Sequence, residues 1–279
     1  MKIVPQLICL VVSMLFSSPS HGQMIVAHRG ASHAAPENTL SAFRLAWEEQ
    51  ADGIEGDFYY TKDQHVVCIH DADTKRTGGI KLKVAESTLE ELRSLEFGSW
   101  KDPRYAGEPI PTFAEVLETV PSGKWFIIEL KTGPEIVPLL QREIQRLRPD
   151  RSKLWVIAFN AATVAAVKTQ LPDLRTHWLT GYKQEGKSGK WLPTAEEVAE
   201  TLRQCKADGL GTQGKREVVD EKFIEILRSQ GLEEFHVWTI DDPADAHFFR
   251  FLGACGITTN TPWKIRKELR IEEHRPENP

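Results

Sequence analysis

The sequence contains little cysteine, no excess of basic charge and few long apolar runs. Four of its 279 residues are cysteines, and Cys9 lies in an N-terminal stretch that we expect to be removed. The other three, Cys68, Cys205 and Cys255, are an odd number, and a chain of about 257 residues can build its core without disulfides. We therefore expect no disulfide framework, although one bridge remains open.

The charge balance excludes one large class of function. The 35 Lys and Arg residues are outnumbered by 40 Asp and Glu, which gives a formal net charge of -5. No broad basic surface is therefore available for nucleic acid. With 41% hydrophobic and 27% charged residues, the chain has the composition of a soluble globular protein rather than a disordered tail or a coiled coil.

The N-terminus has the pattern of an export signal. Lys2 precedes an apolar run at residues 7–16 and a small, polar stretch at residues 17–22. The run is shorter than the roughly 20 apolar residues that span a membrane, and the small residues after it suit cleavage. The sequence predicts a signal peptide at residues 1–22, export to a periplasm or the cell exterior, and one mature domain at residues 23–279 without a membrane span. An uncleaved anchor is the alternative.

After the signal, short apolar runs alternate with stretches of helical periodicity, which is the pattern of parallel βα units. Eight strands are predicted, at residues 24–28, 53–57, 125–130, 154–159, 175–179, 209–212, 235–240 and 256–259. Helices are predicted at residues 38–49, 113–120, 135–146, 161–169, 194–205, 220–229, 243–252 and 263–269. Eight repeats in roughly 250 residues predict an α/β fold, a (β/α)8 TIM barrel. A doubly wound open sheet is the alternative, but its Gly-rich fingerprint does not follow the first strand.

The apolar run at residues 65–69 interrupts this alternation. It follows the second strand too closely to be a parallel neighbour, so we predict the return arm of a hairpin. The hairpin turns at residues 63–64 and places His70 opposite Asp57. Residues 71–111, rich in glycine and charge, then form a small insertion after the second strand. Such an insertion lies over the mouth of a barrel, where active sites form.

Acidic residues gather at the predicted carboxyl ends of the strands. Glu55 and Asp57 end the second strand and share a face because they are two residues apart, as do Glu129 and Lys131 on the third. Three inward carboxylates repel one another unless positive charge lies among them. An all-oxygen set without thiolate suits Mg2+ or Ca2+, and we predict a metal site. The alternative is that each carboxylate pairs with a cation such as Lys131 or Arg29.

Two histidines stand at the same rim. His28 ends the first strand and His70 the hairpin, and histidine can serve as acid or base near neutral pH. Arg29 and Lys131 fit an anionic substrate such as a phosphate. Trp238, near the end of the seventh strand, either walls the pocket or fills the barrel. The remaining histidines are interpreted as surface or packing residues, namely His21, His33, His65, His177, His236, His247 and His274.

In combination these motifs resemble the glycerophosphodiester phosphodiesterase family over essentially the whole mature chain. The motifs that carry the resemblance are His28-Arg29-Gly30, Pro36-Glu37-Asn38-Thr39 with Ala42-Phe43, Glu55-x-Asp57, Thr61-Lys62-Asp63, His70-Asp71, Glu108-Pro109-Ile110-Pro111-Thr112, Glu129-Leu130-Lys131 and Val237-Trp238-Thr239. The sequence departs from the family's pattern in three places. Gly56 replaces a larger apolar residue, Gln64 replaces a turn glycine, and residues 258–260 lack an aspartate often found there.

The resemblance implies a TIM barrel that hydrolyses glycerophosphodiesters, small-molecule substrates, to glycerol phosphate and an alcohol. It implies that Glu55, Asp57 and Glu129 bind Ca2+ or Mg2+ and that His28 and His70 form the catalytic pair. It also implies that Arg29 and Lys131 lie near the substrate phosphate.

Several points remain open from sequence. The attacking group is the substrate's neighbouring hydroxyl or a water molecule, and either histidine can be the acid. A phosphodiesterase or lyase acting on intact phospholipid is a second candidate, which needs a hydrophobic rim. An inactive barrel used as a binding module is a third, although it would have no chemical need for the metal and histidine positions.

Overall fold

Residues 23–186 and 188–270 are described by a computed structural model of the chain. The predicted signal peptide at residues 1–22 lies outside the described residues, as do His21 and His274. Within them, no helix combines the length and the apolar character that crossing a bilayer requires. The three cysteines of this part, Cys68, Cys205 and Cys255, are free.

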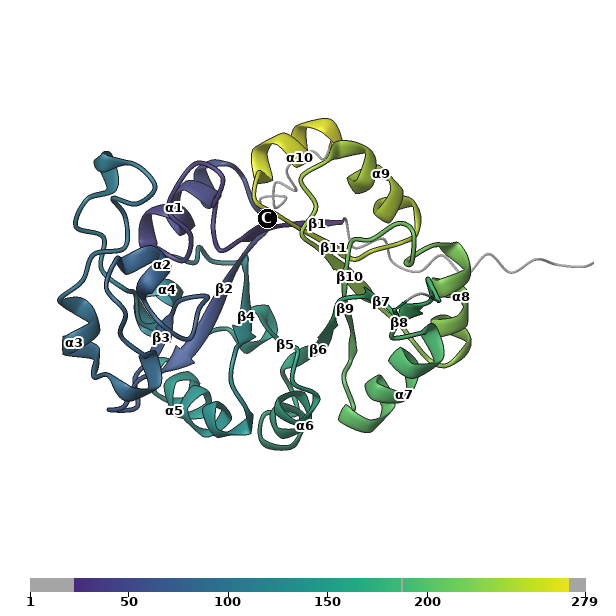
Figure 1. Cartoon of the computed structure of the whole chain (residues 1–279), viewed down its shortest axis with the longest axis horizontal. Helices are drawn as coiled ribbons and strands as arrows, with labels where there is room; N and C mark the ends of the chain where they lie inside the picture. Colours follow the sequence, from purple (N-terminus) through teal and green to yellow (C-terminus); the bar gives the residue numbers. More distant parts are fainter. Residues whose placement is uncertain (1–22, 187, 271–279) are drawn as a thin grey trace, which may run out of the picture.

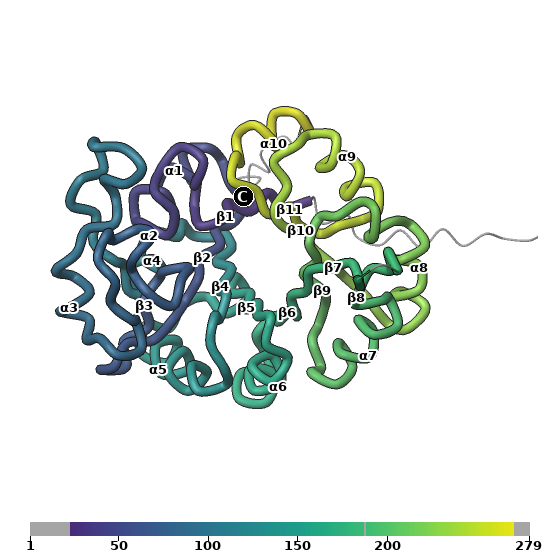
Figure 2. The backbone as a smooth tube through the Cα atoms, in the orientation of Figure 1, coloured from purple at the N-terminus to yellow at the C-terminus, as the bar shows by residue number. Residues whose placement is uncertain are grey.

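Eight parallel strands in the described part of the chain close into a barrel, as predicted (Figure 1). They are β1 (Met24–His28), β2 (Gly53–Tyr60), β4 (Trp125–Leu130), β5 (Leu154–Ala158), β6 (Arg175–Thr180), β9 (Gly209–Gln213), β10 (Phe235–Trp238) and β11 (Gly256–Thr259). The order is β1-β11-β10-β9-β6-β5-β4-β2, and β1 also pairs with β2, which closes the ring. Figure 2 shows β11 beside β1 at the closure.

Helices surround the barrel and bury their apolar faces against it. They are α1 (Leu40–Glu48), α4 (Phe113–Glu118), α5 (Val137–Leu147), α6 (Ala161–Gln170), α7 (Ala195–Cys205), α8 (Glu221–Ser229), α9 (Pro243–Phe251) and α10 (Pro262–Glu268). Threonines begin several of them: the side chains of Thr112 and Thr194 accept from the backbone nitrogen three residues on, which satisfies a free N–H of the first turn. A ribbon of β7 (Lys183–Gln184) and β8 (Trp191–Leu192) precedes α7.

The predicted hairpin exists, but its register differs by one residue from our expectation. β3 (Val66–Cys68) is antiparallel to β2, and Phe58 pairs with Cys68. The Asp57 carbonyl therefore accepts from the Ile69 nitrogen, not from His70. The cause is a three-residue loop closed between Thr61 and His65, in which Gln64 takes a left-handed φ of 64°. A two-residue turn at residues 63–64 was the wrong interpretation.

The insertion at residues 71–111 is ordered and has its own small core. It contains α2 (Lys75–Gly78) and α3 (Leu89–Arg93), with 3-10 turns η1 (Val84–Glu86) and η2 (Pro103–Tyr105); η3 (Pro134–Ile136) and η4 (Arg151–Lys153) lie outside it. Its apolar side chains pack on the hairpin. This cluster comprises Val67, Ile69, Val84, Leu92, Phe97 and Ile110. The insertion is thus fixed over one side of the barrel (Figure 1).

The amino-terminal end of the barrel is sealed by two buried histidines, which we call the floor pair. His177 on β6 and His236 on β10 are 0% and 2% exposed. Their Nδ1 atoms are 3.0 Å apart, and His177 Nε2 lies 2.7 Å from Glu234 Oε1. Both rings pack edge-on against Trp155. The interpretation of these histidines as packing residues is confirmed, but they have a carboxylate partner that we did not expect.

Candidate active site

The first strand ends in a sharp turn that places a guanidinium in the barrel mouth. Arg29 has a left-handed φ of 56°, and Gly30 follows with φ 80°. A Cβ at Gly30 would lie 2.5 Å from the backbone carbon of Ala42, so a glycine lets this turn pack against α1. The Arg29 side chain reaches Glu37 Oε1 at 2.9 Å and Asp57 Oδ2 at 3.1 Å. A fixed positive charge therefore lies among the carboxylates.

Three buried carboxylates from two adjacent strands converge at this rim. Glu55 and Asp57 stand on β2 and Glu129 on β4, where Asp57 and Glu129 are register partners. One carboxylate oxygen of each lies within 4.8 Å of the others. The three residues are 1%, 0% and 8% exposed. The structure thus brings together the three residues that the sequence predicts as metal ligands.

Crowding and burial shift the protonation of these carboxyls. Burial, and then the charges of Asp57 and Glu129, raise the pKa of Glu55 well above its usual range. Burial and the charge of Asp57 raise the pKa of Glu129 to about 7. Burial alone would also raise the pKa of Asp57, but Lys131 and Arg29 outweigh it and hold this pKa far below its usual range. Three carboxyls share two cations, so the site accommodates further positive charge.

The set of donor atoms fits a hard divalent cation. Lys131 Nζ lies 3.2 Å from Asp57 Oδ1 and 2.7 Å from Glu129 Oε1. Two of the three carboxylates thus have the cation partner that the alternative to a metal site requires. This pairing leaves Glu55 Oε1 buried without a hydrogen-bond partner among the described residues. An all-oxygen set with an unpaired buried oxygen suits a cation that prefers oxygen ligands, and it lacks the nitrogen and sulfur donors typical of zinc.

Asn38 orients the central carboxylate. Its Nδ2 donates to Asp57 Oδ2 at 2.8 Å, and its Oδ1 accepts from the Asp57 backbone nitrogen at 3.2 Å and from Cys68 Sγ at 3.1 Å. Helix α1 is capped by Thr39, whose side chain accepts from the nitrogen of Ala42. Asn38 is therefore free to fix Asp57 in one rotamer.

His28 makes its hydrogen bond with a residue from the other end of the chain. Its Nδ1 lies 2.7 Å from Oδ1 of Asn260, which follows β11, and Ser32 Oγ donates to the same oxygen at 2.8 Å. Burial, and then the charge of Arg29, lower the pKa of His28 to about 4. The ring is therefore neutral near pH 7, and its Nε2 has no hydrogen-bond partner among the described residues.

His70 has a charged partner where His28 has a neutral amide. Its Nδ1 lies 2.7 Å from Asp71 Oδ1, and 32% of its side chain is exposed. Asp71 also accepts from Arg76 Nε at 2.7 Å. Burial alone would raise the pKa of Asp71, but the hydrogen bonds from Arg76 and His70 lower it. Asp71 therefore stays a carboxylate beside the ring.

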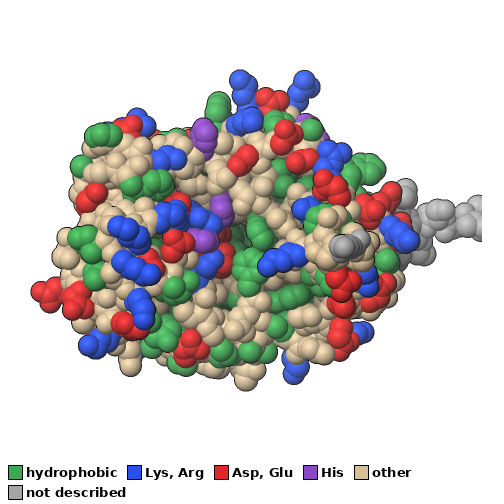
Figure 3. All heavy atoms as spheres, viewed as in Figure 1, with side chains coloured by type: hydrophobic (Ala, Val, Ile, Leu, Met, Phe, Trp, Pro, Cys, Tyr) green, Lys and Arg blue, Asp and Glu red, His purple; other side chains and the backbone are tan. Residues whose placement is uncertain are grey.

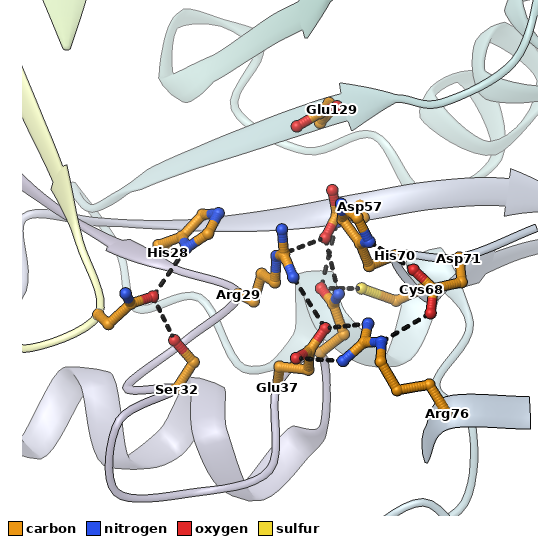
Figure 4. A network of polar contacts seen from close by, with 12 residues as sticks. His28, Arg29, Ser32, Glu37, Asp57, Cys68, His70, Asp71, Arg76 and Glu129 are labelled. Atoms are coloured by element: carbon orange, nitrogen blue, oxygen red, sulfur yellow. Dashed lines mark hydrogen bonds and ion pairs between the residues drawn. The ribbon is translucent and has the colours of Figure 1, made fainter. Parts of the chain in front are cut away.

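Arg76, on the insertion helix α2, connects the two sides of the mouth (Figure 4). Besides Asp71 it donates to both oxygens of Glu37 at 2.8 Å, and Glu37 also accepts from Arg29 at 2.9 Å. Burial alone would raise the pKa of Glu37, but the bonds from Arg76 and Arg29 lower it. The insertion is thereby tied to the turn after β1. Figure 3 shows basic, acidic and histidine side chains meeting near the centre of the face it displays.

Trp238 ends β10 at the same rim as the carboxylates. Its ring meets that of Phe159, which follows β5, edge to face with centroids 5.3 Å apart. Phe159 is 46% exposed, so this aromatic pair faces the mouth. Trp238 also packs on the buried cluster inside the barrel, so its ring takes part both in the wall of the mouth and in the filling of the barrel.

Several residues of this network escaped the sequence prediction. We named Glu37 and Asn38 only within a motif of the family resemblance, assigned no role to Arg76, and noted Asn260 only as a departure from the family's pattern. The one clue that these residues share is their place in the sequence, because each follows the end of a strand or lies in the insertion. Their partners lie far away in the sequence, and periodicity does not report such contacts.

Comparison with known proteins places these motifs in one family. The model of the glycerophosphoryl diester phosphodiesterase family matches residues 28–264. The chain is 30% identical over 243 residues to a glycerophosphodiester phosphodiesterase of Caldanaerobacter subterraneus subsp. tengcongensis, covering 86% of this chain and 94% of the relative. It is 28% identical over 256 residues to one of Bacillus subtilis, covering 86% and 84%.

Solved structures show the same fold. An Oleispira antarctica phosphodiesterase, in complex with the product sn-glycerol-3-phosphate, has a TM-score of 0.79 at 25% identity and covers 88% of this chain and 96% of that one. A glycerophosphodiester phosphodiesterase of Thermotoga maritima has a TM-score of 0.69 at 25% identity and covers 88% and 98%. Both likenesses extend over nearly the whole barrel.

Proposed function

The chain belongs to the glycerophosphoryl diester phosphodiesterase family, and from that premise we propose that it hydrolyses glycerophosphodiesters to glycerol 3-phosphate and an alcohol with His28 and His70 as the proton-transfer pair. One observation carries the proposal: the carboxylate triad, both histidines and two cations meet at one end of the barrel. The phosphodiesterase that holds sn-glycerol-3-phosphate as its product supports a small-molecule substrate of this class.

Glu55, Asp57 and Glu129 are the residues that would hold the divalent cation, Ca2+ or Mg2+. When bound, the ion supplies positive charge that offsets negative charge on the substrate's phosphate and lowers the pKa of a nearby hydroxyl. Asn38 keeps Asp57 in one orientation for this task. Arg29 and Lys131 contact the same carboxylates, and they attract the anionic phosphate into the mouth.

His28 is the base of the first step. Its Nδ1 faces Asn260, so Nε2 is the nitrogen left to accept a proton. The pKa of about 4 keeps the ring neutral near pH 7. Nε2 removes the proton from the attacking hydroxyl as the new O–P bond forms.

His70 is the acid of the first step. Asp71 accepts from its Nδ1 and can stabilise a positively charged ring. The proton on Nε2 passes to the leaving alcohol oxygen as its bond to phosphorus breaks. After this step His28 carries the proton of the attacking hydroxyl, and His70 is left without its Nε2 proton. Trp238 and Phe159 wall the side of the mouth that we assign to the departing alcohol.

The attacking hydroxyl is the substrate's own neighbouring glycerol hydroxyl, which produces a cyclic phosphate. In the second step His70 removes a proton from water, the water oxygen bonds to phosphorus, and His28 returns its proton to the ring oxygen that leaves. Direct attack by water is the competing route. A substrate analogue without the neighbouring hydroxyl separates them, since the cyclic route predicts loss of turnover and undiminished turnover would contradict it.

The activity test compares three classes of substrate. The purified protein is incubated with Ca2+ or Mg2+ and glycerophosphocholine, glycerophosphoethanolamine or intact phospholipid, and glycerol phosphate and free alcohol are assayed. We expect turnover of the first two. Turnover of phospholipid alone would favour the lipid-directed alternative, and no turnover of any substrate would favour the binding module. His28→Gln is the matched control for background hydrolysis.

We also propose that the enzyme is exported, with residues 1–22 removed. Support comes from the sequence alone, through the basic start and the short apolar run. Expression of the full chain with its N-terminus, followed by mass spectrometry of the mature protein, tests this. A product that begins near residue 23 outside the cytoplasm is expected, whereas a full-length product in the membrane fraction would indicate the uncleaved anchor.

A further inference from the structure

The partner of His28 is itself held by a second acidic residue. Asn260 Nδ2 donates to Asp241 Oδ2 at 2.6 Å, and the Asn260 backbone nitrogen donates to Asp241 Oδ1 at 2.7 Å. Thr259 Oγ1 donates to the same Oδ1 at 2.8 Å. Both Asp241 oxygens therefore act as acceptors, which is how an aspartate carboxylate bonds.

This arrangement determines which way the Asn260 amide points. A carboxylate only accepts hydrogen bonds, so the NH2 group must face Asp241 and the carbonyl oxygen must face His28. The hydroxyl of Ser32 donates to that oxygen as well. Because Oδ1 is an acceptor, Nδ1 of His28 at 2.7 Å must carry the proton. The tautomer of His28 thus follows from a carboxylate that does not touch it.

We propose that Asp241 and Asn260 form a matched pair of positioning residues that locks His28 in its Nδ1–H tautomer and presents a deprotonated Nε2 to the substrate. The pair acts through His28 and touches no reacting atom. This inference rests on the proposed function, in which His28 is the base of the first step.

Because Asp241 and Asn260 are a carboxylate and an amide that face each other, replacing one of them should have a different effect from exchanging both. An aspartate at position 260 would place two carboxylates at the 2.6 Å separation of Asn260 and Asp241, and like charges so close disfavour the ionised pair. An asparagine at position 241 would remove the acceptor that orients the amide of Asn260, so that amide could turn over. Exchanging the two residues restores one carboxylate and one amide, and the acceptor facing His28 is kept.

A double-mutant cycle tests this coupling. Asn260→Asp and Asp241→Asn should each lower kcat by about tenfold to a hundredfold with little change in KM, which is the range of coupling between contacting residues. The exchanged variant Asn260→Asp/Asp241→Asn should recover to within a few fold of the parent enzyme. Losses that simply multiply in the double variant would overturn the proposal.

A matched control addresses charge and folding. Asp242 neighbours Asp241 but caps helix α9, where its side chain accepts from the nitrogens of Ala244 and Asp245. Asp242→Asn removes the same charge and keeps a capping side chain. It should leave kcat unchanged, and a loss as large as that of Asp241→Asn would show that general charge, not positioning, is responsible.

Nitrogen NMR of the imidazole provides a readout that does not depend on turnover. In protein labelled with 15N at histidine, the signals absent from His28→Gln belong to His28, and their shifts report which nitrogen carries the proton. We expect the Nδ1–H tautomer in the parent and in the exchanged variant, and a mixture in Asp241→Asn. An Nε2–H tautomer in the parent would overturn the proposal.

The same variants separate this inference from the proposed function. If His28→Gln keeps full activity, the catalytic role of His28 fails, while the NMR result still decides whether the pair fixes the tautomer. If His28→Gln is inactive but both single variants keep the Nδ1–H tautomer and full kcat, the positioning pair fails alone.

Discussion

The barrel holds two pairs of histidines, one at each end, in opposite environments. At the mouth, His28 and His70 each bond through Nδ1 to a side chain behind them, with 2.7 Å to Asn260 and to Asp71. In the floor pair, His177 and His236 bond to each other, and Glu234 takes the remaining nitrogen of His177. Within residues 23–186 and 188–270, Nε2 of each ring at the mouth has no hydrogen-bond partner, whereas both nitrogens of His177 are bonded and the floor pair ends at the Glu234 carboxylate.

The residues around the histidines, not the histidines themselves, therefore separate the two tasks. The floor pair is packed against Trp155, and Gly209 and Gly211 leave room for the rings, since a Cβ at either would approach within 2.5 Å of one of them. That environment suits stability. The mouth pair lies beside buried carboxylates and cations, which suits proton transfer. If this division holds, substitutions at the mouth reduce turnover and substitutions in the floor pair reduce stability.

The largest effect is expected at the carboxylate triad. Glu129→Gln keeps the size of the side chain but removes its charge, so binding of Ca2+ or Mg2+ weakens and several kcal/mol of transition-state stabilisation are lost, roughly a thousandfold in kcat. Titration calorimetry and steady-state assays measure both quantities. A chelator should abolish turnover in the parent enzyme, and near-normal turnover after chelation would contradict the metal site.

Removal of a histidine from the mouth should affect catalysis far more than folding. His70→Ala deletes the acid and is expected to lower kcat by about 10²–10⁴ fold. Its melting temperature should stay close to that of the parent, because the half-exposed ring contributes little to the core. Calorimetry and kinetics on the same preparation measure the two effects. Comparable losses of stability and activity would mean that His70 is structural.

The floor pair should respond in the opposite way. His177→Leu roughly keeps the volume but leaves His236 without its hydrogen-bond partner and Glu234 with Arg175 alone, which should lower the free energy of unfolding by about 1–3 kcal/mol. The activity should change by no more than a few fold, since the site is at the other end of the barrel. Urea unfolding monitored by tryptophan fluorescence gives the first quantity. A large loss of kcat in a stably folded variant would show that the two ends are coupled.

The sequence predicted the carboxylates and histidines of the mouth better than it predicted the residues that hydrogen-bond to them. Strand periodicity and the two-residue spacing placed Glu55 beside Asp57 and predicted that Glu129 would join them, because these relations are local or follow from neighbouring parallel strands. Asn260 reaches His28 across 232 positions, and only closure of the barrel brings the two together. The hairpin register failed for a similar reason, since the left-handed backbone of Gln64 is not a property that its residue type predicts.

The smallest effect is the pH dependence that the floor pair adds to stability. Burial lowers the pKa of His177. Burial, and then the charges of His177 and Arg175, lower the pKa of His236 well below its usual value. The folded pKa values are therefore lower than those of the unfolded chain, near 6.5. As the pH falls below that value, the unfolded state binds protons that the folded state does not.

The contribution of the floor pair is therefore complete above about pH 6.5 and is lost as the pH falls toward the folded pKa values. Each histidine that protonates only on unfolding adds up to about 1.4 kcal/mol per pH unit to the slope of unfolding free energy against pH. Urea titrations between about pH 5.5 and 8 should show a shallower slope for His236→Leu than for the parent. Burial alone would raise the pKa of Glu234, but hydrogen bonds from His177 and Arg175 lower it to about 2, so this carboxylate stays ionised in the folded protein throughout that window. Equal slopes in the two proteins would mean that the floor pair is protonated in the folded state, and the contrast between the two ends of the barrel would then fail.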